Sequence, residues 1–339
     1  MKIAYIIYPE VIISNRSNGI RAQAIAWAEI LEKYYNISVT FVNNWNDYNW
    51  RDFDAIHLFG GGGNWVERVS KRLKPMNDRI VYSPIVDPNP NANIKIDRLK
   101  VLLPKLALNK IMTNFSLRER QYRYIRRVLV RSNFEKSYIQ RVYAVNENKF
   151  KLVPLSFTPS LCNDILNRQQ KENFCFHISS LYQDRKNVLR LVKAAKKYGF
   201  DLYLAGNKGT DAQFKFLQDE ISNSSNIHVL GFISEEQKIA FYKRAKVFAL
   251  PSLQEGVGIV ALDAALLGCE IVITNIGAPK EYYNNMACVV NPYDIDQIGV
   301  SIQKLLNDEV KYQTQLSDYI EKFYSPQIIG AKLIGAYNF

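Results

Sequence analysis

The sequence predicts an α/β protein built from two Rossmann-like, doubly wound parallel-sheet domains that face a cleft. Apolar runs of strand length alternate along the chain with segments of helical period, which indicates parallel sheets covered by helices on both faces. The 339 residues exceed what one hydrophobic core usually holds together. A polar segment interrupts the alternation once, near the middle of the chain. The cleft between two such domains is the expected ligand site.

The first half, residues 1–155, is predicted to form one domain. Its expected strands lie at 2–8, 38–42, 54–59, 79–82, 127–131 and 151–155. Its expected helices lie at 20–35, 64–73 and 116–125, with a further helical stretch around Lys100 that is interrupted at Pro104. A glycine run at 60–63 fits a flexible turn and a phosphate cradle equally well.

A linker is predicted at residues 156–172, because this segment is polar, contains Pro159 and shows no sustained period. The second domain is predicted at 173–325, and residues 326–339 are expected to form a helix that packs back on the first domain. Strands of the second domain are expected at 174–178, 201–205, 227–230, 247–250 and 270–274. Helices are expected at 187–198, 211–221, 235–244, 258–267 and 294–306.

The charge of the chain is strongly asymmetric. Residues 1–160 contain 25 Lys and Arg against 13 Asp and Glu, whereas the remainder contains 19 of each. The first half is therefore expected to face an anionic partner, such as a membrane surface, a phosphate-bearing acceptor or nucleic acid. Arg120, Arg123 and Arg127 recur at helical spacing, although Arg127 also begins the strand expected at 127–131; the run fits a solvated face and a lipid-binding face about equally.

Several classes of protein are disfavoured by composition. No apolar run is long enough to span a bilayer, and the N-terminus lacks the pattern of a secretory signal, so a cytoplasmic protein is expected. The four cysteines form no close pair and fit reduced core thiols. His57 and His177 fall within predicted strands and are expected in the core, and no His, Cys and Asp cluster predicts a metal site.

Residues 251–265 carry the most informative pattern. They follow an apolar strand and open a helix, so Gly256 and Gly258 let backbone N–H groups approach a diphosphate at the positive end of the helix. Glu255 precedes the helix and Asp263 lies two turns along it. Carboxylates suit the hydroxyl groups of a sugar or a ribose, although an isolated pair of this kind is more often an ordinary surface feature.

The same segment resembles the signature of the retaining GT-B glycosyltransferases called glycosyl transferases group 1, in which two Glu residues are separated by seven others. Glu255 stands at the first position, and Asp263, one methylene shorter than Glu, at the second. Residues 177–188 resemble the family's diphosphate-binding segment. Arg185 and Lys186 fall on its cationic pair, whereas Ser180 stands where an Arg is common.

The resemblance covers nearly all of residues 174–307. It continues through 204–209, through 229–234 where the family holds the base, and through 275–281. In the first half it is limited to Asn18 and Gly19, residues 130–134 and residues 153–154. The family's acceptor-side histidine has no counterpart, because no His occurs between His57 and His177, and Asp87 is the substitute candidate.

The resemblance implies transfer of a sugar from a nucleoside diphosphate sugar to a glycan or lipid-linked glycan in bacterial surface polysaccharide or glycolipid assembly, without metal or cofactor. Peripheral association with an anionic membrane is expected as well. The predicted catalytic residues are Glu255, Arg185 and Lys186. The predicted donor-binding residues are Gly256, Gly258, Ile259, Asp263, Ser180, Gly206, Phe232 and Ile233. The predicted acceptor-side residues are Asn18, Gly19 and Asp87.

Two other classes stay open at this point. A non-hydrolysing sugar-nucleotide epimerase can share the same architecture, and release of nucleoside diphosphate that depends on an acceptor would distinguish a transferase from it. A nucleic-acid-binding protein would explain the basic half. The sequence contains no recognisable recognition helix or aromatic stacking motif, and its second half is neutral, so nucleic acid is not an expected partner.

Overall fold

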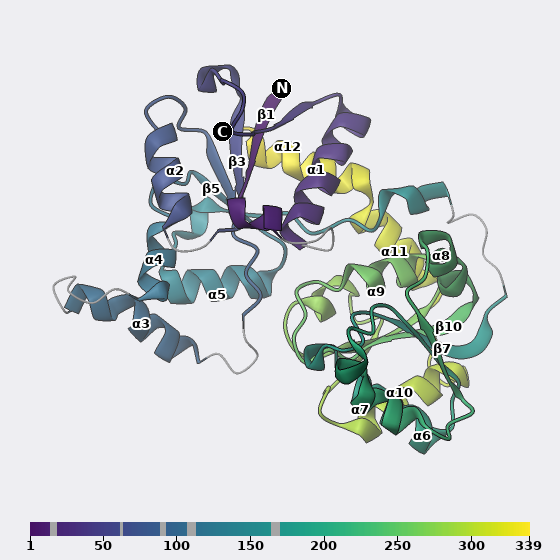
Figure 1. Cartoon of the computed structure of the whole chain (residues 1–339). Helices are drawn as coiled ribbons and strands as arrows, with labels where there is room; N and C mark the ends of the chain where they lie inside the picture. The colour runs from purple at the N-terminus through teal and green to yellow at the C-terminus, as the bar shows by residue number, and fades with distance from the viewer. Residues whose placement is uncertain (14–18, 62–63, 89–92, 107–112, 164–169) are drawn as a thin grey trace. The chain divides into compact units, whose positions relative to one another are not determined.

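A computed structural model describes the chain except for residues 14–18, 62–63, 89–92, 107–112 and 164–169. The chain divides into two compact units (Figure 1). The first unit contains Met1–Leu155 and Pro326–Phe339, and the second contains Ser156–Ser325. Each unit holds a six-stranded sheet in which every pair of neighbouring strands is parallel. The predicted fold class, with two doubly wound parallel sheets, is confirmed.

The sheet of the first unit has the strand order β2-β1-β3-β4-β5-β6. The central strand β3 is buried along its whole length, as expected for a parallel strand covered on both faces. In spatial order the strands are β2 (Ser38–Phe41), β1 (Lys2–Ile7), β3 (Ala55–Phe59), β4 (Ile80–Ser83), β5 (Arg127–Val130) and β6 (Phe150–Leu152). The last strand thus begins and ends earlier than the predicted 151–155.

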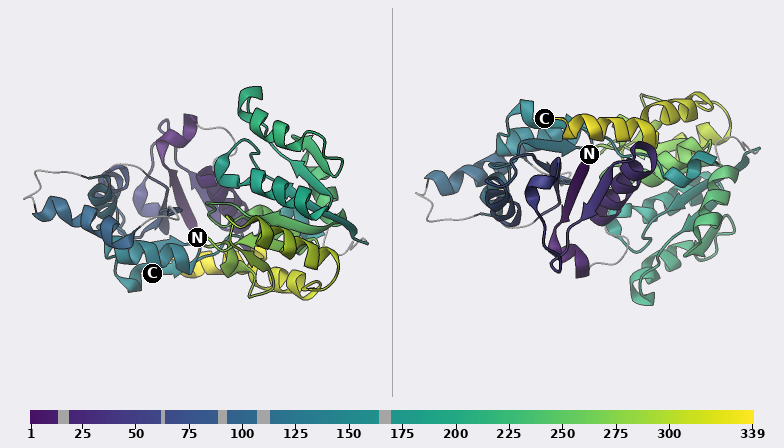
Figure 2. Two further views of the ribbon diagram at one scale, coloured as in Figure 1. Left: turned by 90° about the horizontal axis from the view of Figure 1, so that it is seen from below. Right: turned by 90° about the horizontal axis from the view of Figure 1, so that it is seen from above.

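Six α-helices belong to the described part of the first unit. They are α1 (Gly19–Tyr35), α2 (Trp65–Leu73), α3 (Ile94–Leu106), α4 (Asn114–Arg120), α5 (Asn133–Tyr143) and α12 (Pro326–Tyr337). α12 packs against α1 and appears at the yellow end of the colour scale in Figure 2. α3 packs against α4 and α5 and lies at the periphery of this unit, away from its sheet (Figures 1 and 2).

Buried hydrogen bonds attach α12 to the sheet. The Tyr337 hydroxyl lies 2.9 Å from the Tyr5 hydroxyl and 2.8 Å from His57 Nδ1. The Arg127 guanidinium donates to the carbonyls of Gly335 and Ala336, which lie in the last turn of the helix. His57 is fully buried, as predicted, and burial holds its pKa well below the ordinary value. Residues from β1, β3 and β5 therefore fix this helix.

Three predictions in the first unit were wrong. α3 is not interrupted at Pro104, because the Lys100 carbonyl, whose helical N–H partner the proline removes, accepts the Thr113 hydroxyl at 2.7 Å instead. The helix predicted at 116–125 ends at Arg120. Arg120, Arg123 and Arg127 therefore do not share one helical face, since they lie in α4, in a turn and in β5 respectively.

The second unit contains Ser156–Ser325 and has the strand order β12-β11-β10-β7-β8-β9. Its strands are β7 (Glu172–Ile178), β8 (Leu202–Ala205), β9 (Ile227–Gly231), β10 (Ala245–Leu250), β11 (Glu270–Thr274) and β12 (Cys288–Val290). Its α-helices are α6 (Val188–Tyr198), α7 (Asp211–Ile221), α8 (Glu235–Arg244), α9 (Ile259–Leu266), α10 (Ile295–Leu306) and α11 (Gln315–Tyr324). All of these match predicted elements within a few residues, apart from β12 and α11, which were not predicted.

Candidate functional site

The turn between β10 and α9 forms the centre of the candidate site. Gly258 adopts a left-handed conformation at φ +75°, and an added Cβ would lie 2.9 Å from Leu250 Cδ2, so the turn requires glycine. Gly258 has no side chain to cap α9, and the Ala261 N–H donates to the Gly258 carbonyl at 2.9 Å, so the N–H groups of Ile259 and Val260 are the ones available to an anionic ligand. Gly256 is half-buried before this turn, and Ile259 is 38% exposed just after it.

The three predicted catalytic residues lie together beside this turn. Lys186 Nζ donates to Glu255 Oε2 at 2.6 Å, and both side chains are largely buried, at 14% and 13% exposure. The Ser252 hydroxyl donates to the same carboxylate oxygen at 3.2 Å. Arg185 is exposed, and its backbone carbonyl accepts the Leu253 N–H at 2.8 Å, which joins the two loops. The two cations therefore differ: one neutralises Glu255 and the other faces solvent.

Asn187 holds these loops in place, a role that the sequence did not indicate. Its side-chain amide donates to the carbonyls of Pro251 at 2.8 Å and Pro292 at 2.6 Å, and its Oδ1 accepts Arg190 at 2.9 Å. The residue is buried in a left-handed conformation directly before α6. An Asn after a cationic pair, at the start of a helix, is the signal that could have identified it.

Asp263 lies in a different environment from the one predicted for it. Its side chain is buried, and its two oxygens accept the Thr158 N–H at 2.8 Å and the Thr158 hydroxyl at 2.7 Å. Burial raises the pKa of Asp263, and the two bonds from Thr158 oppose that rise. The carboxylate therefore connects α9 to residues 156–163. Its predicted contact with a ligand hydroxyl requires this connection to open.

Gly206 and His177 shape the loop that follows β7. An added Cβ on Gly206, at φ +122°, would lie 1.7 Å from the Ser179 carbonyl oxygen, so the two chain segments touch directly beside Ser180. His177 Nδ1 donates to the Ala249 carbonyl at 2.8 Å, and its Nε2 therefore accepts the Ser179 hydroxyl at 2.7 Å. Burial lowers the pKa of His177 to about 4, so the neutral imidazole is a core component, as predicted.

The loop after β9 presents an aromatic ring to solvent. Phe232 is 87% exposed, which is unusual for so large an apolar side chain, and Ile233 beside it is half-buried. Gly231 precedes them in a left-handed conformation at φ +70° and ends the strand. An exposed ring on a fixed turn offers a surface on which a planar base can stack.

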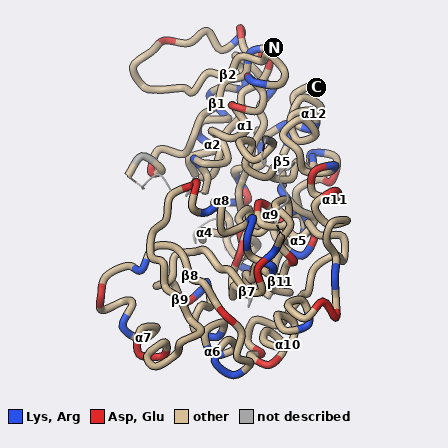
Figure 3. Tube along the Cα trace, turned by 90° about the vertical axis from the view of Figure 1, so that its right-hand side faces the viewer, with Lys and Arg blue, Asp and Glu red and all other residues tan. Residues whose placement is uncertain are grey.

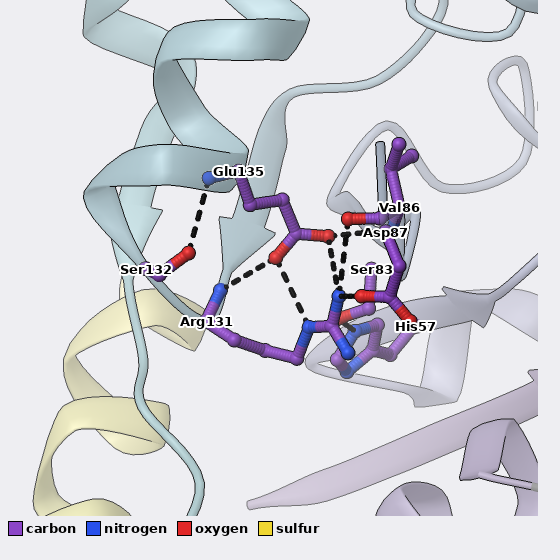
Figure 4. Close-up of polar contacts among 7 residues, drawn as sticks. All are labelled: His57, Ser83, Val86, Asp87, Arg131, Ser132 and Glu135. Atoms are coloured by element: carbon purple, nitrogen blue, oxygen red, sulfur yellow. Dashed lines mark hydrogen bonds and ion pairs between the residues drawn. The ribbon is translucent and has the colours of Figure 1, made fainter. Parts of the chain in front are cut away.

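The predicted acceptor-side residues are spread through the first unit. Asn18 lies outside the described residues, and Gly19 begins α1 with open space around its Cα. Asp87 accepts a hydrogen bond from the Arg131 guanidinium at 2.7 Å, and Arg131 is itself held by Glu135 at 3.1 Å (Figure 4). Asp87 is thus fixed in one orientation at the end of a buried ion-pair network, with its side chain 40% exposed.

A cavity of about 440 Å³ in the first unit includes Asp87 in its lining. Helices α3, α4 and α5 supply most of its other polar and aromatic groups. Those groups are Asp97, Lys100, Phe115, Arg118 and Tyr138. Two carboxylates, two cations and two aromatic rings in one hollow are suited to a polar, multiply hydroxylated ligand.

The described residues contain no group of three or more His, Cys, Asp or Glu side chains that could hold a metal ion. Within the same residues, no helix has the length and apolar character needed to cross a bilayer.

Comparison with known proteins bears on this site. The sequence profile of the family described as Glycosyl transferases group 1 matches residues 163–323. The O-antigen chain mannosyltransferase B of Escherichia coli is 24% identical over 198 residues, which cover 54% of this chain and 52% of that protein. The chain thus matches only about half the length of that relative.

Solved structures resemble the whole chain. The sucrose-phosphate synthase of Thermosynechococcus elongatus has a TM-score of 0.71 at 16% identity and covers 99% of this chain and 98% of its own. Anabaena Alr3699/HepE, solved in complex with UDP, has a TM-score of 0.70 at 16% identity and covers 99% of both chains. At such low identity the likeness establishes the fold, which is of the GT-B type.

Proposed function

We propose that the chain is a retaining GT-B glycosyltransferase of the glycosyl transferases group 1, whose profile matches residues 163–323, and that it transfers a sugar from a nucleoside diphosphate sugar to a hydroxyl acceptor. The observation that carries this proposal is the group formed by Arg185, Lys186 and Glu255 beside the uncapped start of α9. Two cations and a helix N-terminus supply positive potential, and the carboxylate supplies a hydrogen-bond acceptor for a sugar hydroxyl.

The leaving diphosphate is the group that gains negative charge as the glycosidic bond breaks. In the proposed reaction the exposed Arg185 and the first N–H groups of α9 bind its oxygens, and these donors are already fixed before the reaction begins. Lys186 serves both the diphosphate and Glu255, because its ammonium has three donors and only one is used at 2.6 Å. These groups perform the neutralisation that a divalent cation performs in other transferases.

The remaining donor residues have proposed roles that follow from their positions. Phe232 stacks on the base, with Ile233 beside it, because the ring is exposed on a turn at the carboxyl end of β9. Glu255 accepts a hydroxyl of the sugar. Asp263 accepts a ribose hydroxyl after it releases Thr158, because both of its carboxylate oxygens accept hydrogen bonds from Thr158 in this structure. Ser180 and Gly206 line the diphosphate loop.

The proposed acceptor is a glycan or a lipid-linked glycan used in bacterial surface polysaccharide or glycolipid assembly. The mannosyltransferase relative acts, by its name, on an O-antigen chain, which supports an acceptor of this class. Asp87 is the proposed acceptor-side carboxylate, since the Arg131 network holds it at the rim of a polar cavity. Gly19, which begins α1, and Asn18, which precedes it in the sequence, are proposed to contact the acceptor.

Nucleotide binding tests the donor site directly. Thermal unfolding in the presence of UDP, GDP or ADP should show a rise in melting temperature with at least one of them, because a ligand that binds only the native state stabilises it. Phe232→Ala and Arg185→Ala should each reduce that rise. Lys193→Ala, which removes a cation from the same unit on α6, is the matched control. Equal shifts in all four proteins would remove these residues from the site.

Turnover distinguishes a transferase from a sugar-nucleotide epimerase of the same fold. The protein is incubated with GDP-mannose or UDP-glucose, with and without a lipid-linked glycan acceptor, and free nucleoside diphosphate and the products are measured by mass spectrometry. Release of nucleoside diphosphate that requires the acceptor supports the proposal. A change in the sugar of the donor without any acceptor would establish the epimerase instead.

A further inference from the structure

Helix α3 of the first unit carries an unusual row of exposed apolar side chains. Ile96 and Leu99 are each 51% exposed, Leu103 is 40% exposed and Leu106 is 74% exposed. Their spacing of three, seven and ten residues from the first places all four within an arc of about 80° on the helix. We call these four residues the apolar stripe. Single exposed hydrophobic residues are common, but a contiguous row marks an interaction surface.

The opposite side of the same helix is packed into the first unit. Asp97 and Val101 are buried, and Pro104 on the same side is buried too. This side faces α4 and α5, and the Tyr138 hydroxyl donates to Asp97 at 3.0 Å. The helix is therefore held firmly by one face while the apolar stripe is exposed; Ile96, the first residue of the stripe, also lines the cavity that contains Asp87. The stripe is a fixed feature of the fold and does not depend on folding upon binding.

Positive charge surrounds the apolar stripe. Lys95 and Lys100 lie on either side of it around the helix axis; Lys95 is exposed, whereas Lys100 is 44% exposed and pairs with Asp97 at 3.2 Å. Residues 94–127 contain ten Lys and Arg against two Asp and Glu. The whole first unit contains 26 Lys and Arg against 13 Asp and Glu, and the second contains 18 against 19. Figure 3 marks these charges along the chain, and α7 of the second unit carries both signs.

We propose that α3 docks the protein on an anionic lipid surface, with the apolar stripe buried among the acyl chains and the flanking Lys95 at the head groups. An apolar face bordered by basic residues is the pattern of a helix that lies in the membrane interface. Anionic lipids attract each such lysine or arginine. A second copy of the same face would carry the same excess of positive charge and would be repelled.

This surface replaces the one predicted from Arg120, Arg123 and Arg127. Two of those residues make contacts within the first unit. Arg123 forms ion pairs with Glu119 at 3.7 Å and Glu67 at 3.9 Å, and Arg127 donates to the last carbonyls of α12. The proposal does not depend on the donor chemistry, since α3 belongs to the first unit and the donor residues belong to the second.

Vesicle binding by the full chain tests the proposal. Leu99→Gln with Leu103→Gln removes two apolar contacts at exposed positions, and Phe216→Gln with Val300→Gln makes the same kind of change on exposed helix positions of the second unit. Partitioning onto vesicles of phosphatidylglycerol and phosphatidylcholine, measured by sedimentation, should fall about tenfold in the first variant, which corresponds to about 1.4 kcal/mol. The second variant should bind like the wild type.

A charge variant tests the basic flank separately. Lys95→Gln should lower binding to the same vesicles about fivefold, whereas Lys215→Gln on α7 should leave it unchanged. Each variant should bind to vesicles of phosphatidylcholine alone as the wild type does, and added salt should weaken the interaction of the wild type with anionic vesicles.

Two results would overturn the proposal. The first is equal partitioning of the wild type and the Leu99→Gln, Leu103→Gln variant onto anionic vesicles, including the case in which neither binds. The second is a dimer of the wild type in analytical ultracentrifugation that this variant abolishes, because the stripe would then be covered by a second copy. Unchanged stabilisation by UDP or GDP in the variant would show that its fold and its donor site are intact, whichever result is obtained.

Discussion

Replacing Lys186 by Ala should separate the two roles of the cationic pair. The Glu255 side chain is 13% exposed in the wild type, and the substitution removes its 2.6 Å ion pair and leaves the Ser252 hydroxyl, at 3.2 Å, as a remaining donor. Removing one partner of a fully buried pair costs about 3–5 kcal/mol, and a carboxylate with some solvent access and one remaining donor should cost less, about 2–3 kcal/mol of unfolding free energy.

The two cations should differ in their effect on the fold, because Lys186 is only 14% exposed whereas Arg185 is exposed. Arg185→Ala should therefore leave the unfolding free energy within about 0.5 kcal/mol of the wild type. Its affinity for UDP or GDP should fall by about 1.5–3 kcal/mol through loss of a charge-assisted hydrogen bond.

The decisive comparison adds Glu255→Gln to Lys186→Ala. A neutral amide no longer requires a buried cation, so the double variant should regain most of the lost stability without regaining nucleotide affinity. Urea unfolding measures the stability of each protein, and isothermal titration with UDP and GDP measures the affinity. The reasoning fails if Lys186→Ala is as stable as the wild type, or if the double variant is less stable than Lys186→Ala.

Three further predictions concern metal, pH and the loop after β7. Activity should survive excess EDTA, because protein cations and the start of α9 neutralise the leaving group; loss of activity that magnesium or manganese restores would contradict this. Lowering the pH from 6.5 to 4 should reduce the unfolding free energy by about 3 kcal/mol through His177. The imidazole binds a proton in the unfolded chain over this range, whereas the folded imidazole, with a pKa of about 4, stays mostly neutral. A His177→Asn variant should show a correspondingly flatter dependence in pH-resolved urea titrations, and an identical slope would argue against it. Gly206→Ala should destabilise the protein by more than about 4 kcal/mol, because its Cβ would meet the Ser179 carbonyl at 1.7 Å. Gly335→Ala in α12, where an added Cβ meets nothing within 4 Å, should instead be neutral or stabilising; urea unfolding of both variants measures the difference.

The alternation of strands and helices was predictable where each element carries its own pattern. β10 is an apolar run followed by a glycine turn and a helix, and its residues are almost all buried, so sequence and structure agree. α5 was missed because much of its buried face consists of Glu135, Tyr138 and Tyr143, which look polar in a sequence. Glu135 is buried only because Arg131 of β5 pairs with it.

The candidate site was predictable in its residue types and less so in its contacts. The sequence identified Glu255 and Lys186 separately, but the pairing of two groups 69 residues apart depends on the tertiary fold. Asp263 was expected to face a ligand, and its burial depends on Thr158, which lies 105 residues earlier. β12 was missed because it has only three residues and pairs with β11 alone.

The attachment of α12 to the first unit has a consequence for the order in which the protein folds during synthesis. Met1–Leu155 leaves the ribosome first, but Tyr5 and His57 of that segment bond to Tyr337, which is translated after the 170 residues of Ser156–Ser325. At 5–20 residues per second this interval lasts roughly 10–35 s. During this interval the surface of the first segment that packs against α12 is uncovered. The second unit is continuous in sequence and is able to complete its core in the same interval. The unit that begins first therefore matures last.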